Sequence, residues 1–414
     1  MAAKSSMPGQ DMDSFRIFVP MKGWTRKMVA AVVAMGVCVG ARAQAAAAPK
    51  WNVAARGGAA YVTPSFTWRD EMMSTYVFPV ARLEYGYQMT EEDGPYAALF
   101  GFPNVGVGIG WDGLSTLGYK GQSRFKDLYN LYGFAERSLL RGKRVSLDFD
   151  FDLGVGFNRV LYDPVNNPLN RNFSSWLLIY VGGGLSLRVA LTEQVEAGLS
   201  ARFDHYSTGR LAYPNAGIND PLAALSIRYR NAKAPRGKRP APSIDNPPAK
   251  VFYELYAGCG VHKCAIEWQA TGETPPWPIF AFGGSANWRY RPHLSTGVAV
   301  DIYAETAAFQ ARLEQYERKL YGDGNIDAYG PYRRVSGGVG LIQHLHYGNF
   351  SCFLTFGAYV YRHNGFRDQR GRFYQRMGLK YVLPGLSGIF LAADCKAHAF
   401  SRAAMMELTV GIRL

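Results

Sequence analysis

The feature that most constrains the fold is a set of long segments in which apolar and polar residues alternate. The clearest is Val145–Phe157 (VSLDFDFDLGVGF), where one row of side chains is apolar and the other is small or polar, with three aspartates. Successive side chains of a β-strand point to opposite faces, so this segment has one apolar and one polar face. It is longer than an ordinary strand of about five or six residues and approaches the roughly 9–11 residues that cross a bilayer.

The alternation recurs along the whole chain, for example in Val105–Asp112, Leu177–Val189, Cys352–Val360 and Met406–Leu414. A bilayer accepts strands only when every backbone group is paired, which requires closure into a barrel. Strands with an apolar outer row and a polar inner row are the signature of such barrels. The sequence therefore predicts an all-β protein built as a transmembrane antiparallel up-and-down β-barrel.

A segment rich in Pro, Lys, Arg and Ala, residues 231–250, divides the chain. Its prolines exclude a continuing strand or helix, so we expect a linker. Residues 51–230 and 251–414 each contain about eight strand candidates, which leaves two arrangements open: two tandem eight-stranded barrels, or one barrel of about 16 strands. The helical composition of Glu305–Tyr321 predicts a helix within a loop.

Residues 1–43 have the pattern of a signal peptide. Arg26 and Lys27 supply the positive region, Met28–Gly40 the apolar core, and Ala41–Ala43 a small-residue cleavage site. Export to an oxidising compartment permits disulfides in the mature chain. Its four cysteines are then either partly paired, with Cys259 and Cys264 closing a small loop, or small apolar residues on strands.

The chain is basic, with 46 Lys+Arg against 32 Asp+Glu and a formal net charge of +14. The charges are dispersed, apart from one dense cluster at Lys233–Arg239, and no motif of a nucleic-acid reader is present. A solvated linker, or attraction to anionic lipid headgroups, explains the balance better. We expect no nucleic-acid partner, and no spacing indicates a metal or cofactor.

Candidate chemistry lies in Val195–Ser207 (VEAGLSARFDHYS). His205 and Ser207 extend the apolar row that faces lipid, two positions apart and with Cα atoms about 6–7 Å from each other. A serine activated by a neighbouring histidine is the basic unit of acyl-transfer catalysis. The pair by itself is also what the polar end of a membrane strand would show.

The residues that follow distinguish these interpretations. The stretch His205–Asn219 (HYSTGRLAYPNAGIN) resembles the active-site segment of the lipid A 3-O-deacylases, the PagL family of outer-membrane enzymes. The residues that carry the resemblance are His205, Ser207, Gly209, Pro214, Asn215, Gly217 and Ile218. The resemblance implies an eight-stranded barrel with its site on the outer surface, Ser207 as nucleophile and His205 as general base. Backbone N–H groups near Thr208–Gly209 are candidate oxyanion donors.

Two positions depart from the family pattern: Asn219 stands where the family has a glutamate, and Thr208 where it commonly has asparagine. In serine proteases the change from acid to amide lowers turnover by about ten-thousandfold. Outer-membrane phospholipase A nevertheless resembles this arrangement in using Asn with Ser and His. We therefore expect Asn219 to orient His205. Asp204 and Asp220 point to the other face and are not substitutes.

The second half lacks this pattern. His398 is predicted to face the lumen and has no serine two residues on, while His344 and His346 form a lumen pair rather than a metal site. The sequence thus predicts an integral outer-membrane serine esterase that removes an acyl chain from the 3-position of lipid A, with lipopolysaccharide of the outer leaflet as its partner. An outer-membrane phospholipase and a noncatalytic structural or ligand-binding barrel remain the alternatives.

Overall fold

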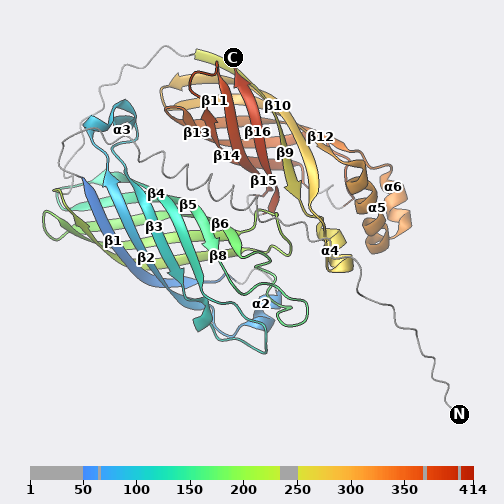
Figure 1. The fold of residues 1–414 in the computed structure, drawn as a ribbon, viewed down its shortest axis with the longest axis horizontal. Coiled ribbons are helices and arrows are strands. Elements are labelled where there is room, and N and C mark those ends of the chain that lie inside the picture. Colours follow the sequence, from blue (N-terminus) through green and yellow to red (C-terminus); the bar gives the residue numbers. More distant parts are fainter. Residues whose placement is uncertain (1–49, 64–66, 234–249, 367–370, 400–401) are drawn as a thin grey trace. The chain divides into compact units, whose positions relative to one another are not determined.

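The computed structural model describes residues 50–63, 67–233, 250–366, 371–399 and 402–414. Its strands form two closed antiparallel barrels of consecutive strands, β1–β8 and β9–β16 (Figure 1). The predicted β-barrel fold is confirmed, and of the two arrangements the chain adopts two eight-stranded barrels rather than one of about 16 strands. The predicted signal peptide, and residues 234–249 of the linker predicted at 231–250, lie outside the described residues.

The first barrel is built from eight long strands. They are β1 (Trp51–Tyr61), β2 (Val77–Gln88), β3 (Asn104–Asp112), β4 (Leu128–Arg141), β5 (Val145–Phe157), β6 (Leu177–Ala190), β7 (Val195–Ser207) and β8 (Ile218–Arg230). Short helical segments lie in its loops: α2 (Thr67–Met72), η1 (Glu91–Asp93), α3 (Pro95–Leu99) and η2 (Leu114–Thr116). Pairing of β1 with both β2 and β8 closes the barrel and leaves no free edge.

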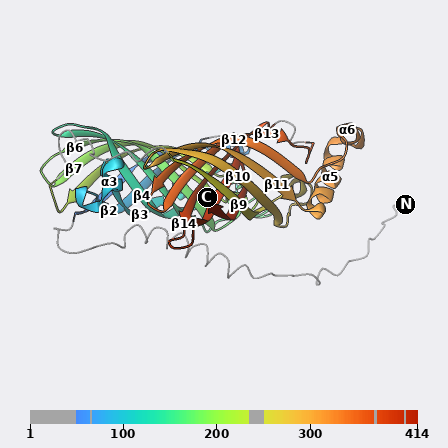
Figure 2. The ribbon, with the colours of Figure 1, turned by 90° about the horizontal axis from the view of Figure 1, so that it is seen from above.

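The second barrel repeats this plan. Its strands are β9 (Lys250–His262), β10 (Trp277–Arg291), β11 (Leu294–Glu305), β12 (Val335–Tyr347), β13 (Phe350–Tyr361), β14 (Phe373–Val382), β15 (Ile389–His398) and β16 (Arg402–Arg413). The helices α4 (Ala265–Thr271), α5 (Ala307–Tyr321) and α6 (Asp323–Tyr329) lie at one end of these strands, all three labelled in Figure 1 and the last two also in Figure 2.

The predicted loop helix is α5, which begins after Glu305, the last residue of β11. Thr306 is its N-cap, and the Thr306 side chain accepts a hydrogen bond from the Phe309 amide at 3.2 Å. Phe309 and Leu313 pack against α4, so the helix is held by apolar contacts as well as by its cap. No helix in the described ranges is long and apolar enough to span a membrane.

The alternating residues of the strands face opposite sides of the barrel wall, with the apolar row outside and the polar row inside. On β5, the Phe149 and Phe151 side chains point outward and are 44% and 40% exposed, whereas the aspartates at 148, 150 and 152 point into the lumen and are almost fully buried. An outer apolar surface and a polar interior are the reverse of a soluble protein and match a strand that lies in lipid. Trp51 packs against Tyr85 and Tyr229 at one end of the strands, as in the aromatic girdles of membrane barrels.

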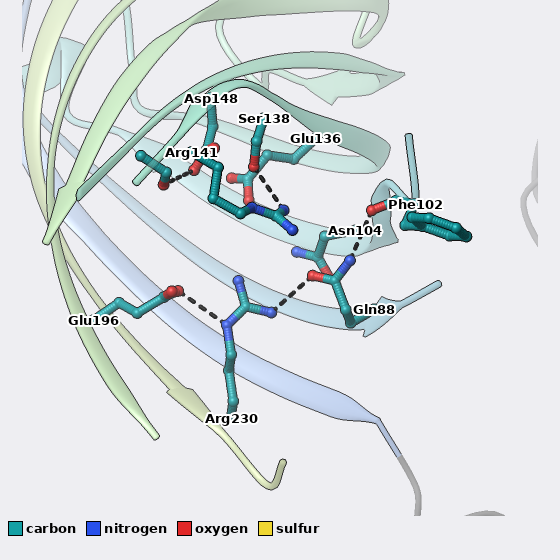
Figure 3. Close-up of a pocket in the computed structure, with 10 residues that line it drawn as sticks. Gln88, Phe102, Asn104, Glu136, Ser138, Arg141, Asp148, Glu196 and Arg230 are labelled. Atoms are coloured by element: carbon teal, nitrogen blue, oxygen red, sulfur yellow. Dashed lines mark hydrogen bonds and ion pairs between the residues drawn. The ribbon is translucent and has the colours of Figure 1, made fainter. Parts of the chain in front are cut away.

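The interior of the first barrel holds charged pairs beside a cluster of buried aromatic and apolar side chains that includes Phe78, Tyr132 and Leu222. Glu136 accepts hydrogen bonds from Arg228 at 2.5 and 2.8 Å and also from Arg188. A small polar pocket remains beside it, where Arg230 donates to Glu196 and Gln88 at 2.9 and 3.1 Å (Figure 3). Burial of these charges is tolerated because nearly all of them are paired.

The two ends of the first barrel differ in their connections. At one end lie four long loops, residues 62–76, 113–127, 158–176 and 208–217. At the other end two of the three connections are tight turns, between β4 and β5 and between β6 and β7. The pocket in Figure 3 lies at the tight-turn end, because its lining residues begin or end strands there.

The cysteines of the second barrel are unpaired in the structure. Cys259 and Cys352 are exposed on the outer surface, Cys395 is half-buried and Cys264 is buried. Cys259, Cys352 and Cys395 are small apolar residues on strands, which is the second of the two interpretations that the sequence left open, whereas Cys264 lies outside the strands as the N-cap of α4.

Candidate active site

His205 and Asn219 are brought together by the register of β7 and β8. In this antiparallel pair His205 lies directly opposite Asn219, and Tyr206 lies opposite Ile218. Both side chains belong to the outer row of their strands, they are half-buried, and they lie at the long-loop end. The backbone of Asn219 is held from the loop that follows β1, since its carbonyl accepts hydrogen bonds from the Thr63 amide and hydroxyl at 3.3 and 2.9 Å.

The contact between the two side chains determines which tautomer the histidine adopts. Nδ1 of His205 lies 2.7 Å from Oδ1 of Asn219. A carboxamide oxygen can only accept, so Nδ1 carries the proton and Nε2 keeps its lone pair. A histidine that acts as general base needs this tautomer, because the unprotonated Nε2 accepts the proton of the nucleophile.

Ser207 ends β7 on the same outer row as His205. It lies opposite Ile179 of β6 and its residue exposure is 9%. Within the described part of the chain, no hydrogen bond joins the Ser207 hydroxyl to the His205 ring. Catalytic hydrogen bonds are often longer in a free enzyme and tighten when substrate binds, so the arrangement stays compatible with a serine–histidine pair.

Gly217 lies close to both members of this pair. A Cβ atom placed on Gly217 would lie 3.4 Å from Cε1 of His205 and 3.4 Å from Cβ of Ser207, and only 2.7 Å from the Tyr206 carbonyl oxygen. The φ angle of Gly217 is +63°, a backbone conformation that favours glycine. The turn before β8 therefore lies beside the two side chains and leaves no spare room between Gly217 and them.

Of the backbone amides near Thr208–Gly209 that were expected as oxyanion donors, that of Thr208 is already engaged, because it donates to Oδ1 of Asn215 at 2.9 Å. The Thr208 hydroxyl is also engaged and donates to the Ala212 carbonyl at 3.0 Å. These contacts close the loop between β7 and β8 on itself and make Asn215 part of the scaffold around Ser207.

Between His205 and Ser207, the side chain of Tyr206 points into the lumen and anchors the strand. The Tyr206 hydroxyl donates to Asp112 at 2.6 Å and accepts from Asn130 at 2.6 Å. Asp204 likewise faces inward, where Oδ2 lies 2.9 Å from Arg82. Asp220 is 2% exposed on the inner row of β8. Neither aspartate therefore shares the outer surface with His205.

The sequence singled out Gly217 only as part of the Pro-Asn-x-Gly pattern, and it did not reveal Tyr206 or Asn172 as part of this site. Asn172 lies in the loop between β5 and β6, and its side-chain amide donates to the Gly217 carbonyl. Nothing in the pattern of the sequence connects Asn172 with a turn that lies far along the chain.

The second barrel arranges its histidines differently. His344 and His346 stack in the lumen with ring centroids 5.5 Å apart, and the two ring nitrogens of His346 each lie 2.8 Å from a serine hydroxyl, those of Ser295 and Ser351. His398 contacts the Tyr359 hydroxyl at 3.0 Å. Among the described residues, no group of three or more His, Cys, Asp or Glu side chains is placed to hold a metal ion.

Comparison with known proteins follows the same division of the chain. Residues 105–229 match the family model described as lipid A 3-O-deacylase (PagL), and residues 251–414 match that described as acyloxyacyl hydrolase, C-terminal domain. No curated protein sequence matches the chain.

Solved structures of membrane barrels are also similar. Neisserial surface protein A has 15% sequence identity and a TM-score of 0.30, and the match covers 44% of this chain and 96% of that one. A mutant of the Rh. blastica porin has 10% identity and a TM-score of 0.16, with 88% and 99% covered.

The fold and the family matches together define a membrane β-barrel hydrolase that acts on ester bonds of lipid A. The matches to the models described as lipid A 3-O-deacylase (PagL) and as acyloxyacyl hydrolase, C-terminal domain, confirm the family resemblance seen in the sequence.

Proposed function

We propose that this protein is an outer-membrane serine esterase that removes the acyl chain at the 3-position of lipid A. The observation that carries the proposal is the contact between His205 and Asn219 on the lipid-facing surface of the first barrel, two residues from Ser207. An enzyme that cuts a lipid inside its own bilayer needs its nucleophile on this face. A soluble esterase would instead enclose it in a cleft.

The end of the barrel at which these residues lie supports the outer leaflet as the place of reaction. Outer-membrane barrels have short periplasmic turns and longer extracellular loops. The candidate site lies at the end that carries four long loops, and the tight turns lie at the other end. Ser207 would then meet lipopolysaccharide near its headgroup, where the esters of lipid A lie.

The proposed chemistry uses only groups of this chain. Oγ of Ser207 attacks the ester carbonyl carbon while Nε2 of His205 accepts the hydroxyl proton, and Asn219 stabilises the tautomer that makes this possible. Collapse of the tetrahedral intermediate breaks the bond to the sugar oxygen, which takes the proton back from His205. Water then attacks the acyl-enzyme by the same route, releasing the fatty acid and restoring Ser207.

Purified protein, offered two substrates separately, tests this function. With detergent-dispersed lipopolysaccharide we expect release of a 3-hydroxy fatty acid, detected by mass spectrometry of the products. Vesicles of phosphatidylethanolamine and phosphatidylglycerol without lipopolysaccharide should release little fatty acid. Hydrolysis of the vesicles alone would instead assign the protein as a phospholipase, and hydrolysis of neither would favour a noncatalytic barrel.

A further inference from the structure

The loop between β5 and β6, residues 158–176, contains two buried asparagines that look equivalent in the sequence. Asn170 and Asn172 are both 0% exposed, and each donates its side-chain amide to a backbone carbonyl. The acceptor of Asn170 is Val160, within the same loop, at 3.0 Å. The acceptor of Asn172 is Gly217, in the turn that lies beside His205 and Ser207.

A second hydrogen bond joins the same two segments. The Ala216 amide donates to the Arg171 carbonyl at 3.0 Å, next to the contact between Asn172 and Gly217. Two adjacent residues of the loop thus hold two adjacent residues of the turn. The same Gly217 leaves no more than van der Waals room beside the pair, since a Cβ atom placed on it would lie 3.4 Å from Cε1 of His205 and 3.4 Å from Cβ of Ser207.

The loop is itself rigid enough to transmit this constraint. The Tyr162 amide donates to the Phe173 carbonyl at 2.6 Å, and Phe173 is fully buried against Phe125 with ring centroids 5.4 Å apart. Asn167 ties the loop to its neighbour, accepting from the Arg124 amide at 2.9 Å. Asn172 therefore belongs to a loop that is packed and hydrogen-bonded to its neighbours.

We propose that Asn172 is a positioning residue of the esterase, which holds the Gly217 turn so that His205 and Ser207 keep their reactive geometry. This inference rests on the proposed function, since it assigns a role toward the same Ser207 nucleophile. Asn172 does not contact the reacting atoms itself. A displacement of about 1 Å by such a supporting group can lower a rate by about a hundredfold.

The test compares Asn172→Ala with Asn170→Ala in the full chain. Asn170 is the matched control, because it is the same residue type, equally buried, in the same loop and bonded to a backbone carbonyl. Asn172→Asp is a second variant, since its carboxylate fills nearly the same space but has no N–H to donate. The folded fraction of each is measured by heat-modifiable mobility in gel electrophoresis.

Two readouts separate positioning from folding. The first is the rate at which a fluorophosphonate probe labels Ser207, which requires an activated serine but no lipid A. The second is the division of lipid A hydrolysis into kcat and KM. For both Asn172 variants we expect labelling and kcat to fall by about 10- to 100-fold with KM changed less than about twofold, while Asn170→Ala stays within about threefold of the wild type.

Equal losses in the Asn172 and Asn170 variants would overturn the inference, because the effect would then belong to the loop in general. Failure of both Asn172 variants to fold, when Asn170→Ala folds, would assign Asn172 to barrel stability and overturn it as well. A wild-type protein that is neither labelled nor active on lipid A contradicts the proposed function and the inference with it. A labelled wild type that leaves lipid A intact contradicts only the substrate, and the labelling rates still decide the role of Asn172.

Discussion

Nδ1 of His205 lies 2.7 Å from Oδ1 of Asn219, directly across the β7–β8 pair. Asn219 fixes the tautomer and the orientation of the His205 ring, as an aspartate or glutamate would. It supplies no negative charge to stabilise the imidazolium that forms during the reaction. The loss seen when a protease acid becomes an amide comes from the wrong tautomer. Here the carboxamide oxygen faces the ring, so the amide does not impose that tautomer.

Replacing Asn219 by Ala should therefore lower kcat by about 10²-fold or more, since general acid–base catalysis contributes about 10²- to 10⁴-fold and His205 would lose its orientation. Asn219→Glu, which installs the acid typical of the family, should retain at least the wild-type kcat. Release of 3-hydroxy fatty acid under saturating lipopolysaccharide measures both. An Asn219→Ala protein with unchanged kcat would remove Asn219 from the site.

Gly217→Ala tests the close approach of the turn to the catalytic pair. The new methyl group would lie 2.7 Å from the Tyr206 carbonyl oxygen and 3.4 Å from both His205 and Ser207, so kcat should fall by about tenfold or more. Gly121→Ala is the matched control. Gly121 also has a positive φ angle, of +69°, but a methyl group there would have nothing within 4 Å. Its variant should share the strain and keep the activity; equal loss of kcat in both would contradict the assigned role of Gly217.

Tyr206→Phe should destabilise the first barrel by about 1–3 kcal/mol, because it leaves the buried Asp112 and Asn130 groups without their shared partner. The urea concentration at half-unfolding in detergent micelles reports the change. Tyr87→Phe serves as the comparison, since the Tyr87 hydroxyl donates to Asp93 at 3.0 Å on the exposed surface. A Tyr206→Phe midpoint no lower than that of Tyr87→Phe would show that the lumen anchor contributes little.

Glu136→Gln probes the charged interior. Glu136 is the shared acceptor of Arg188 and Arg228, and breaking a buried ion pair costs about 3–5 kcal/mol because a charge is left uncompensated. Glu193→Gln removes an exposed partner of Lys233 and should change the free energy of unfolding by about 1 kcal/mol or less. The denaturant midpoints of unfolding of the two variants are compared, and that of Glu136→Gln should be the lower. Similar midpoints would mean that the ion pairs in the lumen are solvated.

Most of the strands could be predicted from the sequence, because a strand in a membrane barrel faces lipid with every second residue and those residues are apolar. Residues Val145–Phe157 were predicted as one strand and are β5 with those bounds. His205 was expected on the lipid-facing row of Val195–Ser207, and that segment is β7 with those bounds and with His205 on its outer row. Closure into two barrels rather than one could not be decided, because it depends on which strand pairs with β1, and alternation contains no information on distant partners.

The residues that support the site could not be predicted for the same reason, since alternation carries no information on contacts between distant segments. His205 and Ser207 lie two residues apart and their shared face follows from strand geometry. Asn172 reaches Gly217 from a loop whose path no periodicity describes, and Asn170 has the same side chain in the same loop with a different task. The sequence also did not indicate that the Thr208 amide, a candidate oxyanion donor, is already engaged. Asn215 lies seven residues further along the chain, and its side-chain oxygen accepts the hydrogen bond of that amide.

The most direct test of the account is mass spectrometry of lipid A from cells that express this chain or its Ser207→Ala variant, with both proteins shown to be folded in the outer membrane. The account predicts that lipid A from cells with the wild-type chain loses the mass of one 3-hydroxyacyl group and that the variant leaves lipid A unchanged. Lipid A that is intact in both, or shortened equally by both, would contradict a serine esterase centred on Ser207.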